Sequence, residues 1–99
     1  MRVVITAEAR ADLDRIGVYI AQDNPSRART FVRELTAKAR ALGDLPEGFE
    51  RVARYGDLNI RRRPYGNCLI FYRVDPDAVV IIHVLQGASD YEALLFGNE

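Results

Sequence analysis

The sequence predicts an α+β domain in which a helical hairpin packs on a twisted antiparallel sheet. The element order is β-α-α-β-β-β, with a short final helix or a partner covering the rest of the sheet. Two amphipathic stretches between residues 7 and 43 indicate the hairpin, and β-branched or apolar runs at residues 2–5 and 58–85 indicate the strands. The 99 residues are 48% hydrophobic and 28% charged, which is typical of one globular domain spanning residues 1–99.

The first strand and the first helix follow from local residue types. Arg2–Ile5 is a short β-branched segment, and Thr6 follows it as a helix N-cap with Glu8 in the first helical turn. We expect this helix to run from about Ala7 to about Gln22. Its apolar face consists of Ala9, Leu13, Ile16 and Ile20, and the polar side chains on its other faces are Arg10, Asp12, Asp14 and Arg15.

The second helix begins shortly after the first. Asn24 is a good N-cap, and Pro25 is tolerated at the first helical position because its missing N–H costs no hydrogen bond there. Gly43 stands where a left-handed residue commonly ends a helix. The apolar stripe of this helix consists of Ala28, Phe31, Val32, Leu35, Ala39 and Leu42. Because only a few residues separate the two helices, they form an antiparallel hairpin.

Three strands are predicted after a loop at residues 44–50, where Pro and Gly interrupt the helical period. Strict alternation divides residues 58–63 between two faces, with Leu58, Ile60 and Arg62 on one and Asn59, Arg61 and Arg63 on the other. Turns at residues 64–66 and 75–77 lead into strands at residues 68–74 and 79–85. These last two strands are apolar on both faces, so a short helix from about Tyr91, or a partner, must cover the face that the hairpin leaves open.

Composition excludes several classes of protein. No apolar run approaches the roughly 20 residues that a membrane-spanning helix needs, so we expect a cytoplasmic protein without membrane contact. Cys68 is the only cysteine, which excludes intramolecular disulfides and multi-thiolate metal sites within one chain. The sequence has no Gly-rich phosphate loop, zinc spacing or paired-carboxylate motif, so we expect no metal and no cofactor.

His83 and Cys68 are residue types that often serve catalysis, but both lie inside apolar strands without a neighbouring catalytic motif. We interpret His83 as a core or edge histidine with a satisfied ring, and Cys68 as a buried and unreactive thiol. Catalytic roles for these two residues are the less favoured alternatives.

The net charge of zero conceals an uneven distribution. Residues 1–50 carry eight basic and eight acidic side chains, whereas residues 51–74 carry six arginines against Asp57, a net charge of +5. Arginines on a strand face bind phosphates or carboxylates in a forked geometry, and a solvated edge strand is the alternative interpretation. Val18 points about 180° away from the apolar face of the first helix, so it is either a contact residue or an ordinary exposed valine.

The sequence resembles the RelE/ParE toxin superfamily over nearly the whole chain, and the ParE branch most closely. The resemblance in the hairpin rests on residues 11–16 (ADLDRI), 19–21 (YIA) and 24–28 (NPSRA), together with Phe31. In the strands it rests on residues 69–74 (LIFYRV), a short Asp-rich turn, and residues 79–85 (VVIIHVL). The order, spacing and length of these segments carry the match, because no single motif is specific.

The resemblance implies the toxin of a type II toxin–antitoxin module, a class associated with plasmid stabilisation. Its partner is a ParD-like antitoxin whose N-terminal dimer domain binds operator DNA and whose C-terminal segment wraps around the toxin, so that the toxin meets DNA only through the antitoxin. We expect the antitoxin to cover the apolar sheet face that the hairpin leaves open and to bring acidic side chains to the basic segment. The expected antitoxin-binding residues are Val18, Arg51, Arg54, Arg61, Arg63 and Arg73.

The resemblance also implies two activities, since free ParE-type toxins block DNA gyrase and RelE-type toxins cut messenger RNA on the ribosome. ParE-type sequences often end the last strand with His-Gly-Ala-Arg-Asp, but here Gln86 replaces the histidine and Ser89 the arginine. For a nuclease, Arg61 and Tyr91 are the candidate catalytic residues, but Ser89 supplies no cation for phosphoryl transfer. We therefore favour non-catalytic gyrase inhibition over the ribonuclease, and a non-toxic corepressor is a third hypothesis.

Overall fold

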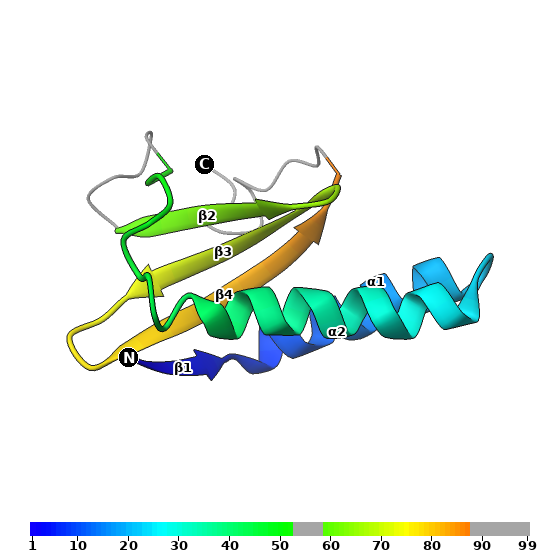
Figure 1. Cartoon of the computed structure of the whole chain (residues 1–99), viewed down its shortest axis with the longest axis horizontal. Coiled ribbons are helices and arrows are strands. Elements are labelled where there is room, and N and C mark those ends of the chain that lie inside the picture. Colours follow the sequence, from blue (N-terminus) through cyan, green and yellow to red (C-terminus); the bar gives the residue numbers. More distant parts are fainter. Residues whose placement is uncertain (53–58, 88–99) are drawn as a thin grey trace.

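In the part of the chain that the structure describes, six elements follow one another in the order that the sequence predicts (Figure 1). The computed structural model describes residues 1–52 and 59–87. The elements are β1 (Arg2–Ile5), α1 (Ala7–Ala21), α2 (Pro25–Ala41), β2 (Ile60–Tyr65), β3 (Cys68–Val74) and β4 (Ala78–Gln86). The short helix expected from about Tyr91 lies outside the described residues.

The strands form one sheet in the order β1-β4-β3-β2. The predicted antiparallel pairing holds for β2 with β3 and for β3 with β4, and β1 occupies the edge as expected. The edge strand β1 runs parallel to β4, so the complete four-stranded sheet is mixed; the sequence had not predicted a direction for this strand. The reason is the path of the chain, because the hairpin and the following loop return it to the end of the sheet where β1 begins (Figure 1). Both β2 and β4 consequently run in the direction of β1.

The helix boundaries follow the predicted caps. The Thr6 hydroxyl accepts a hydrogen bond from the Ala9 amide at 3.1 Å, and the Asn24 side chain accepts one from the Arg27 amide at 3.1 Å. Pro25 occupies the first turn of α2, as predicted. Of the strand expected from Leu58, the structure describes β2 from Ile60, and Asn59 before it adopts a φ of 57°, which is not strand geometry. Leu58 lies outside the described residues.

Gly43 does not have the left-handed conformation that the sequence predicts, because the positive φ angles among the described glycines belong to Gly66 and Gly87. Instead, Gly43 allows the backbone of Met1 to come close to the end of α2. A Cβ atom at Gly43 would lie 2.4 Å from the Met1 carbonyl oxygen, and the Met1 nitrogen donates to the Gly43 carbonyl at 2.7 Å. Glycine at this position therefore lets the end of α2 pack against the start of β1.

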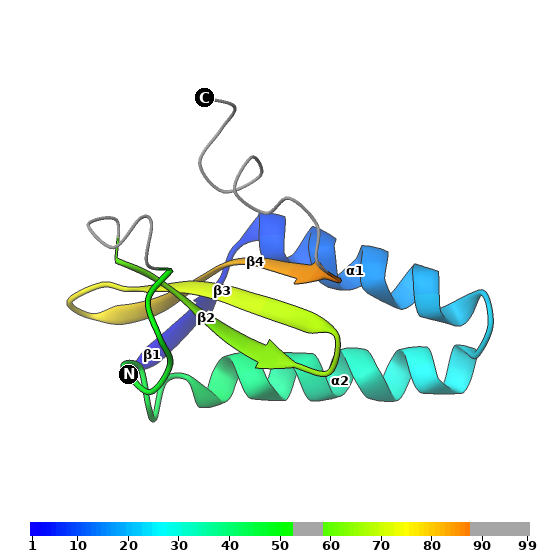
Figure 2. The ribbon, with the colours of Figure 1, turned by 90° about the horizontal axis from the view of Figure 1, so that it is seen from above.

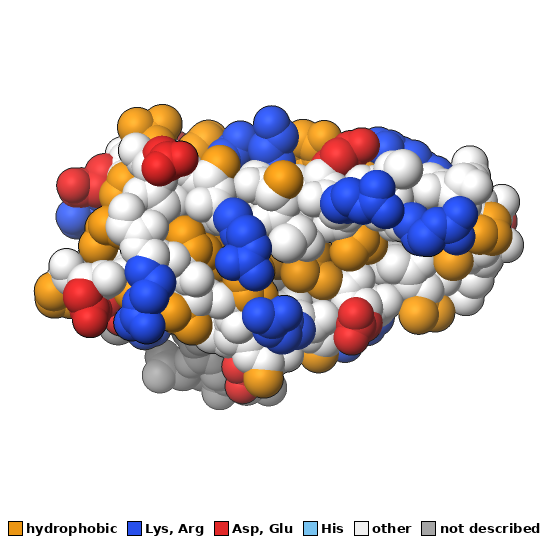
Figure 3. Space-filling view, turned by 60° about the horizontal axis from the view of Figure 1, so that its bottom comes forward, with side chains coloured by type: hydrophobic (Ala, Val, Ile, Leu, Met, Phe, Trp, Pro, Cys, Tyr) orange, Lys and Arg blue, Asp and Glu red, His pale blue; other side chains and the backbone are white. Residues whose placement is uncertain are grey.

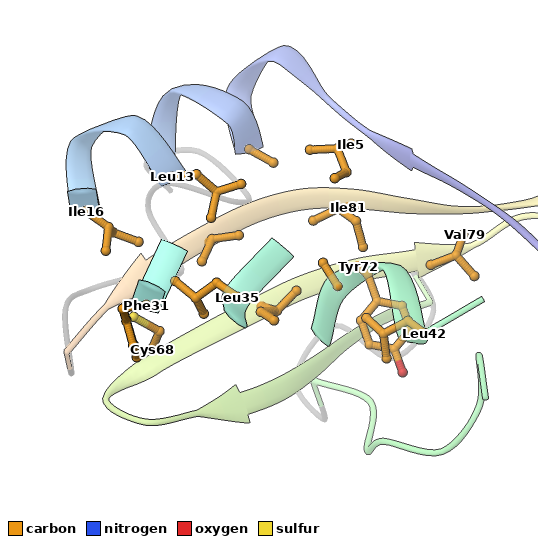
Figure 4. Packing of buried hydrophobic residues seen from close by; sticks show 14 residues of the cluster. Ile5, Leu13, Ile16, Phe31, Leu35, Leu42, Cys68, Tyr72, Val79 and Ile81 are labelled. Atoms are coloured by element: carbon orange, nitrogen blue, oxygen red, sulfur yellow. The ribbon is translucent and has the colours of Figure 1, made fainter. Parts of the chain in front are cut away.

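The helical hairpin covers one face of the sheet (Figure 2). Its predicted apolar side chains form the main core against that face (Figure 4). Leu13, Ile16, Phe31 and Leu35 are buried there, and Ile20 and Val32 are partly buried, as the two apolar stripes predict. A bulge opposite Phe71 and Tyr72 in β4 lets Ile81 and Val84, three residues apart, both join this cluster.

The second face of the sheet carries a smaller apolar cluster, so both faces are apolar as predicted. Its buried members are Val52, Ile60, Phe71 and Leu85, and Leu69 and Ile82 are partly buried beside them. Val52 comes from the loop before β2, and its amide donates to the Ile60 carbonyl at 2.8 Å. Part of the cover for this face is therefore supplied by the chain itself.

Candidate functional site

The first candidate residue, Arg61 on β2, is turned inward and is only 9% exposed. Its Nη1 donates to the Phe49 carbonyl at 2.7 Å, and its Nη2 lies 3.6 Å from the Glu47 carboxylate. Its Nε is also buried and has no hydrogen-bond partner among the described residues. The Arg61 guanidinium therefore links the loop before β2 to the sheet through hydrogen bonds, and it is not exposed to solvent.

The neighbouring arginines are also engaged within the chain. Arg62 pairs with Glu50 at 2.8 Å, and the Arg63 guanidinium lies 4.8 Å from the centroid of the Phe49 ring. Arg73 bonds both oxygens of Asp75, at 2.8 and 3.2 Å, and this hydrogen bonding lowers the pKa of the Asp75 carboxyl below its ordinary value. Much of the positive charge of this segment is thus neutralised by side chains of the same segment and of the loop before it.

The remaining sequence candidates are distributed as follows. Arg51 is exposed and its backbone bridges to Arg61, so β2 is not a bare edge strand at this end. Arg54 and Tyr91 lie outside the described residues, so the structure brings no pair of candidate nuclease residues together within its described ranges. Val18 is 65% exposed on α1, as its position on the helix predicts.

Asp12 is a residue that the sequence analysis placed wrongly, because it was assigned to a polar face and is 3% exposed. Its Oδ2 accepts from the Val84 amide at 2.9 Å and lies 2.7 Å from Nδ1 of His83, and its other oxygen accepts from Arg15. Strand β1 pairs with β4 only as far as Ile81, so beyond that point β4 needs another acceptor along its edge. The Asp12 carboxylate supplies it.

A signal for this burial is present in the sequence. Asp12 lies three residues after Ala9 and four before Ile16, which is the spacing of the apolar face itself. The structure also confirms the interpretation of His83 as a histidine with a satisfied ring. Cys68 is 1% exposed, as predicted, and burial raises the pKa of its thiol.

The outer side of the hairpin contains a groove of about 690 Å³ between α1 and α2. We call it the hairpin groove, and it is lined by Leu13, Asp14, Gly17, Val18, Ala21, Pro25, Ala28, Arg29, Val32 and Arg33. A Cβ atom at Gly17 would lie 3.3 Å from the Val32 side chain, so the missing side chain lets the helices approach closely there. The surface combines a mostly apolar floor with arginines on the α2 side.

The charge on α2 was also missed, because the sequence analysis averaged residues 1–50 to neutrality. Within Pro25–Ala41 the chain has five basic side chains and a single acidic one. Arg27 and Glu34 form an ion pair at 2.8 Å, and the Tyr65 hydroxyl donates to the same carboxylate at 2.8 Å. These bonds lower the pKa of Glu34, whose main partner is Arg27, and raise the pKa of Tyr65. Counting charge helix by helix would have identified the basic helix.

Within residues 1–52 and 59–87, no three His, Cys, Asp or Glu side chains gather in a group that would hold a metal ion. Neither helix of these ranges is long and apolar enough to cross a membrane.

Two solved structures contain chains that are similar in fold to this one. The toxin–antitoxin complex entitled "Chromosomal ParDE TA system from P. aeruginosa" contains a chain that matches with a TM-score of 0.73 and 21% identity, covering 88% of this chain and 96% of that one. A chain of the RelBE2 toxin–antitoxin complex from Mycobacterium tuberculosis matches with a TM-score of 0.64 and 22% identity, covering 86% of this chain and 95% of that one. These likenesses show a shared fold, and no curated protein matches the sequence.

The sequence itself carries the family assignment. Residues 3–91 match the family model described as the ParE toxin of the type II toxin-antitoxin system, parDE. The matched range takes in the hairpin, the groove on its outer side and all strands after β1. The chain therefore belongs to the ParE toxin family.

Proposed function

We propose that this chain is the toxin of a toxin–antitoxin pair, that its antitoxin is ParD-like, and that the free chain inhibits DNA gyrase by binding rather than by catalysis. Family membership and the fold shared with chains of two toxin–antitoxin complexes support the first part. The observation that carries the choice against a ribonuclease is the inward position of Arg61, whose guanidinium is bonded to the Phe49 carbonyl.

A ribonuclease needs positive charge presented to the scissile phosphate. Arg62 and Arg73 are held by carboxylates, and Arg63 lies over the Phe49 ring and donates to the Lys38 carbonyl at 3.3 Å. Their bonds within the chain favour a structural use of this charge. Inhibition of gyrase by binding alone does not require arginines that are free to contact a scissile phosphate.

The first experiment measures both activities of the purified chain. We expect it to impair gyrase supercoiling and to leave messenger RNA intact in a translating extract. RNA cleavage that depends on translation and disappears in Arg61→Ala or Tyr91→Phe would favour the RelE-type activity instead. A chain that does neither, yet binds its antitoxin, would favour the corepressor hypothesis.

For the antitoxin we propose the hairpin groove as the main docking surface. An apolar floor flanked by Arg29 and Arg33 suits an amphipathic helix that brings acidic side chains to the α2 side. Such a segment can be disordered when free and fold on binding. This differs from the expectation that the antitoxin covers the other face of the sheet, where the described residues already form a buried cluster.

The arginines expected to bind the antitoxin keep a smaller part in this proposal. Arg51, Arg63 and Arg73 are exposed or half-buried, so they can meet acidic side chains at the rim of the interface. Arg61 acts through the loop that it holds. Rim charges mainly alter the association rate and its salt dependence.

The docking surface is tested with Val18→Asp and a matched control, Leu45→Asp, because these side chains are 65% and 59% exposed and Leu45 lies outside the groove. We expect the Val18 variant to weaken antitoxin binding at least tenfold, mainly through faster dissociation, because a charge replaces an apolar contact. The control should bind within twofold of the wild type. If both variants bound the antitoxin equally well, the hairpin groove would not be its docking surface.

A further inference from the structure

The loop end of the hairpin extends beyond the ends of the neighbouring strands (Figures 1 and 2). The last buried residue of α1 is Ile16, and the first buried residue of α2 is Ala28. The hairpin groove covers residues 13–21 and 25–33, so it includes most of this extending end. A partner that fills the groove would therefore supply packing that the sheet does not supply there.

Each helix contributes an inner and an outer row of side chains to the groove. The inner rows form the floor, where Leu13 and Ala28 are buried and Gly17 lies close to Val32. Figure 3 shows this side of the molecule, with Lys and Arg side chains along the hairpin and hydrophobic side chains exposed between them. The outer rows are exposed and form two walls, which consist of Asp14 and Val18 on α1 and of Arg29 and Arg33 on α2.

The two walls carry opposite charge. Within the part of the chain that the structure describes, Asp14, Arg29 and Arg33 have no hydrogen bond or ion pair through their side chains. Because the helices are antiparallel and Gly17 meets Val32, Asp14 and Arg33 lie about two residues, or about 3 Å, apart along the groove. Arg29 lies about 6 Å from Arg33 towards the loop end. Both signs of charge therefore remain available to a partner over the same short length of groove.

We infer that Asp14 determines which helix the groove accepts and in which direction that helix lies. The accepted helix carries carboxylates on the flank that faces Arg29 and Arg33, and a lysine or arginine on the flank that faces Asp14. Two carboxylates four residues apart match the spacing of the arginines. Turning a helix end for end in the groove exchanges its flanks, so a helix with one acidic and one basic flank fits in one direction only. This inference rests on the proposed docking of the antitoxin in the groove and names the residue that makes the docking selective.

The test uses two synthetic peptides with the same apolar face, each held helical by a cross-link on its solvent-facing side. The first peptide has glutamates on one flank and lysines on the other, and the second has glutamates on both flanks. We expect the wild type to bind the first peptide about fivefold more tightly, because the second brings a like charge to Asp14. Asp14→Lys should reverse this preference. Fluorescence anisotropy of labelled peptides measures both affinities.

The matched control is Asp44→Lys, which makes the same change in net charge at an exposed position beyond the end of α2. It should keep the wild-type preference, and thermal unfolding checks that both variants fold. Equal affinity of the two peptides for the wild type, or an unchanged preference in Asp14→Lys, would overturn the inference. Reversal in both variants, or failure of both peptides to bind, would overturn it as well.

The direction of the bound helix is tested with a third peptide, in which the acidic and basic flanks of the first are exchanged. A spin label at the N-terminus of each peptide broadens the amide signals of the residues near it. We expect the first and third peptides to broaden signals at opposite ends of the groove, one near Asp14 and the other near Ala21. Broadening at the same end by both peptides would contradict the inferred role of the flanks.

Val18→Asp separates this inference from the proposed docking surface. If it weakens the binding of both peptides at least tenfold, the peptides occupy the groove, and a missing flank preference then overturns the role of Asp14 alone. If it weakens neither peptide, they bind elsewhere, which overturns the inference. The docking of the antitoxin is decided by its own titration with the same variant.

Discussion

The arginines of β2 and several of those of α2 differ in their surroundings: the former are bonded within the chain, whereas the latter are exposed. On β2, Arg61 is 9% exposed and bonded to loop carbonyls, and Arg62 pairs with Glu50. On α2, Arg33 and Arg40 are exposed and have no side-chain partner among the described residues. A run of positive charge in a sequence therefore does not identify a binding surface by itself. Partners within the chain decide whether the charge serves the fold or remains available.

Substitution of Asp12 is expected to have the largest effect among the inward-facing charged groups. Asp12→Ala leaves the Val84 amide without its acceptor and separates His83 from its partner, so we expect a loss of about 3 to 5 kcal/mol in the free energy of unfolding. Urea unfolding measures it. Asp14→Ala, two residues along the same helix and exposed, is the control and should change stability by less than about 0.5 kcal/mol.

Arg61→Ala should come next and sharpens the contrast between the two sets of arginines. Removing hydrogen bonds from a charged and buried group should cost about 1.5 to 3 kcal/mol, whereas Arg40→Ala should stay within about 0.5 kcal/mol. The same unfolding measurement applies to both. If the two substitutions cost the same, the distinction between inward and outward arginines loses its energetic basis.

The smallest effect is expected at Glu34 and depends on pH. Hydrogen bonding to Arg27 lowers the pKa of the folded-state carboxyl, so the unfolded chain binds the proton more readily. Its stabilisation is then complete above the ordinary pKa of about 4.3 and is lost as pH falls through the folded-state value. The difference in urea midpoint between wild type and Glu34→Gln should therefore shrink from pH 5 to pH 3. Asp23→Asn, at an exposed position, is measured alongside as the control.

Local rules predicted the elements of this fold because they depend on neighbouring residues. Thr6 and Asn24 cap their helices as expected, and alternation in β2 correctly turned Arg61 and Ile60 to opposite faces. The mixed sheet escaped these rules, since the direction of β1 depends on a partner more than seventy residues away. The helical spacing of Asp12 is a local signal for its burial, but its hydrogen-bonding role could not be predicted locally, because that role is set by the free edge of β4.

The candidate site was predicted less well than the fold. Val18 was correctly identified as exposed from its position on one helix, but the hairpin groove needs two helices to exist. Arg61 was assigned to the surface because the sequence does not show that the loop before β2 folds over it. The basic character of α2 was readable from the sequence and was hidden only by averaging over too long a window.

The parallel pairing of β1 with β4 also affects how the chain is completed during synthesis. Residues 2–5 are made first, yet their partners are residues 78–81, and Asp12 bonds to residue 84. Contacts of such long sequence separation form slowly, because closing a large loop costs conformational entropy before the contacts can stabilise the chain. The hairpin can assemble early from local contacts, but the sheet that supports it closes only when residues 78–84 have left the ribosome. Until β4 emerges, β1 therefore lacks the strand with which it pairs in the folded protein.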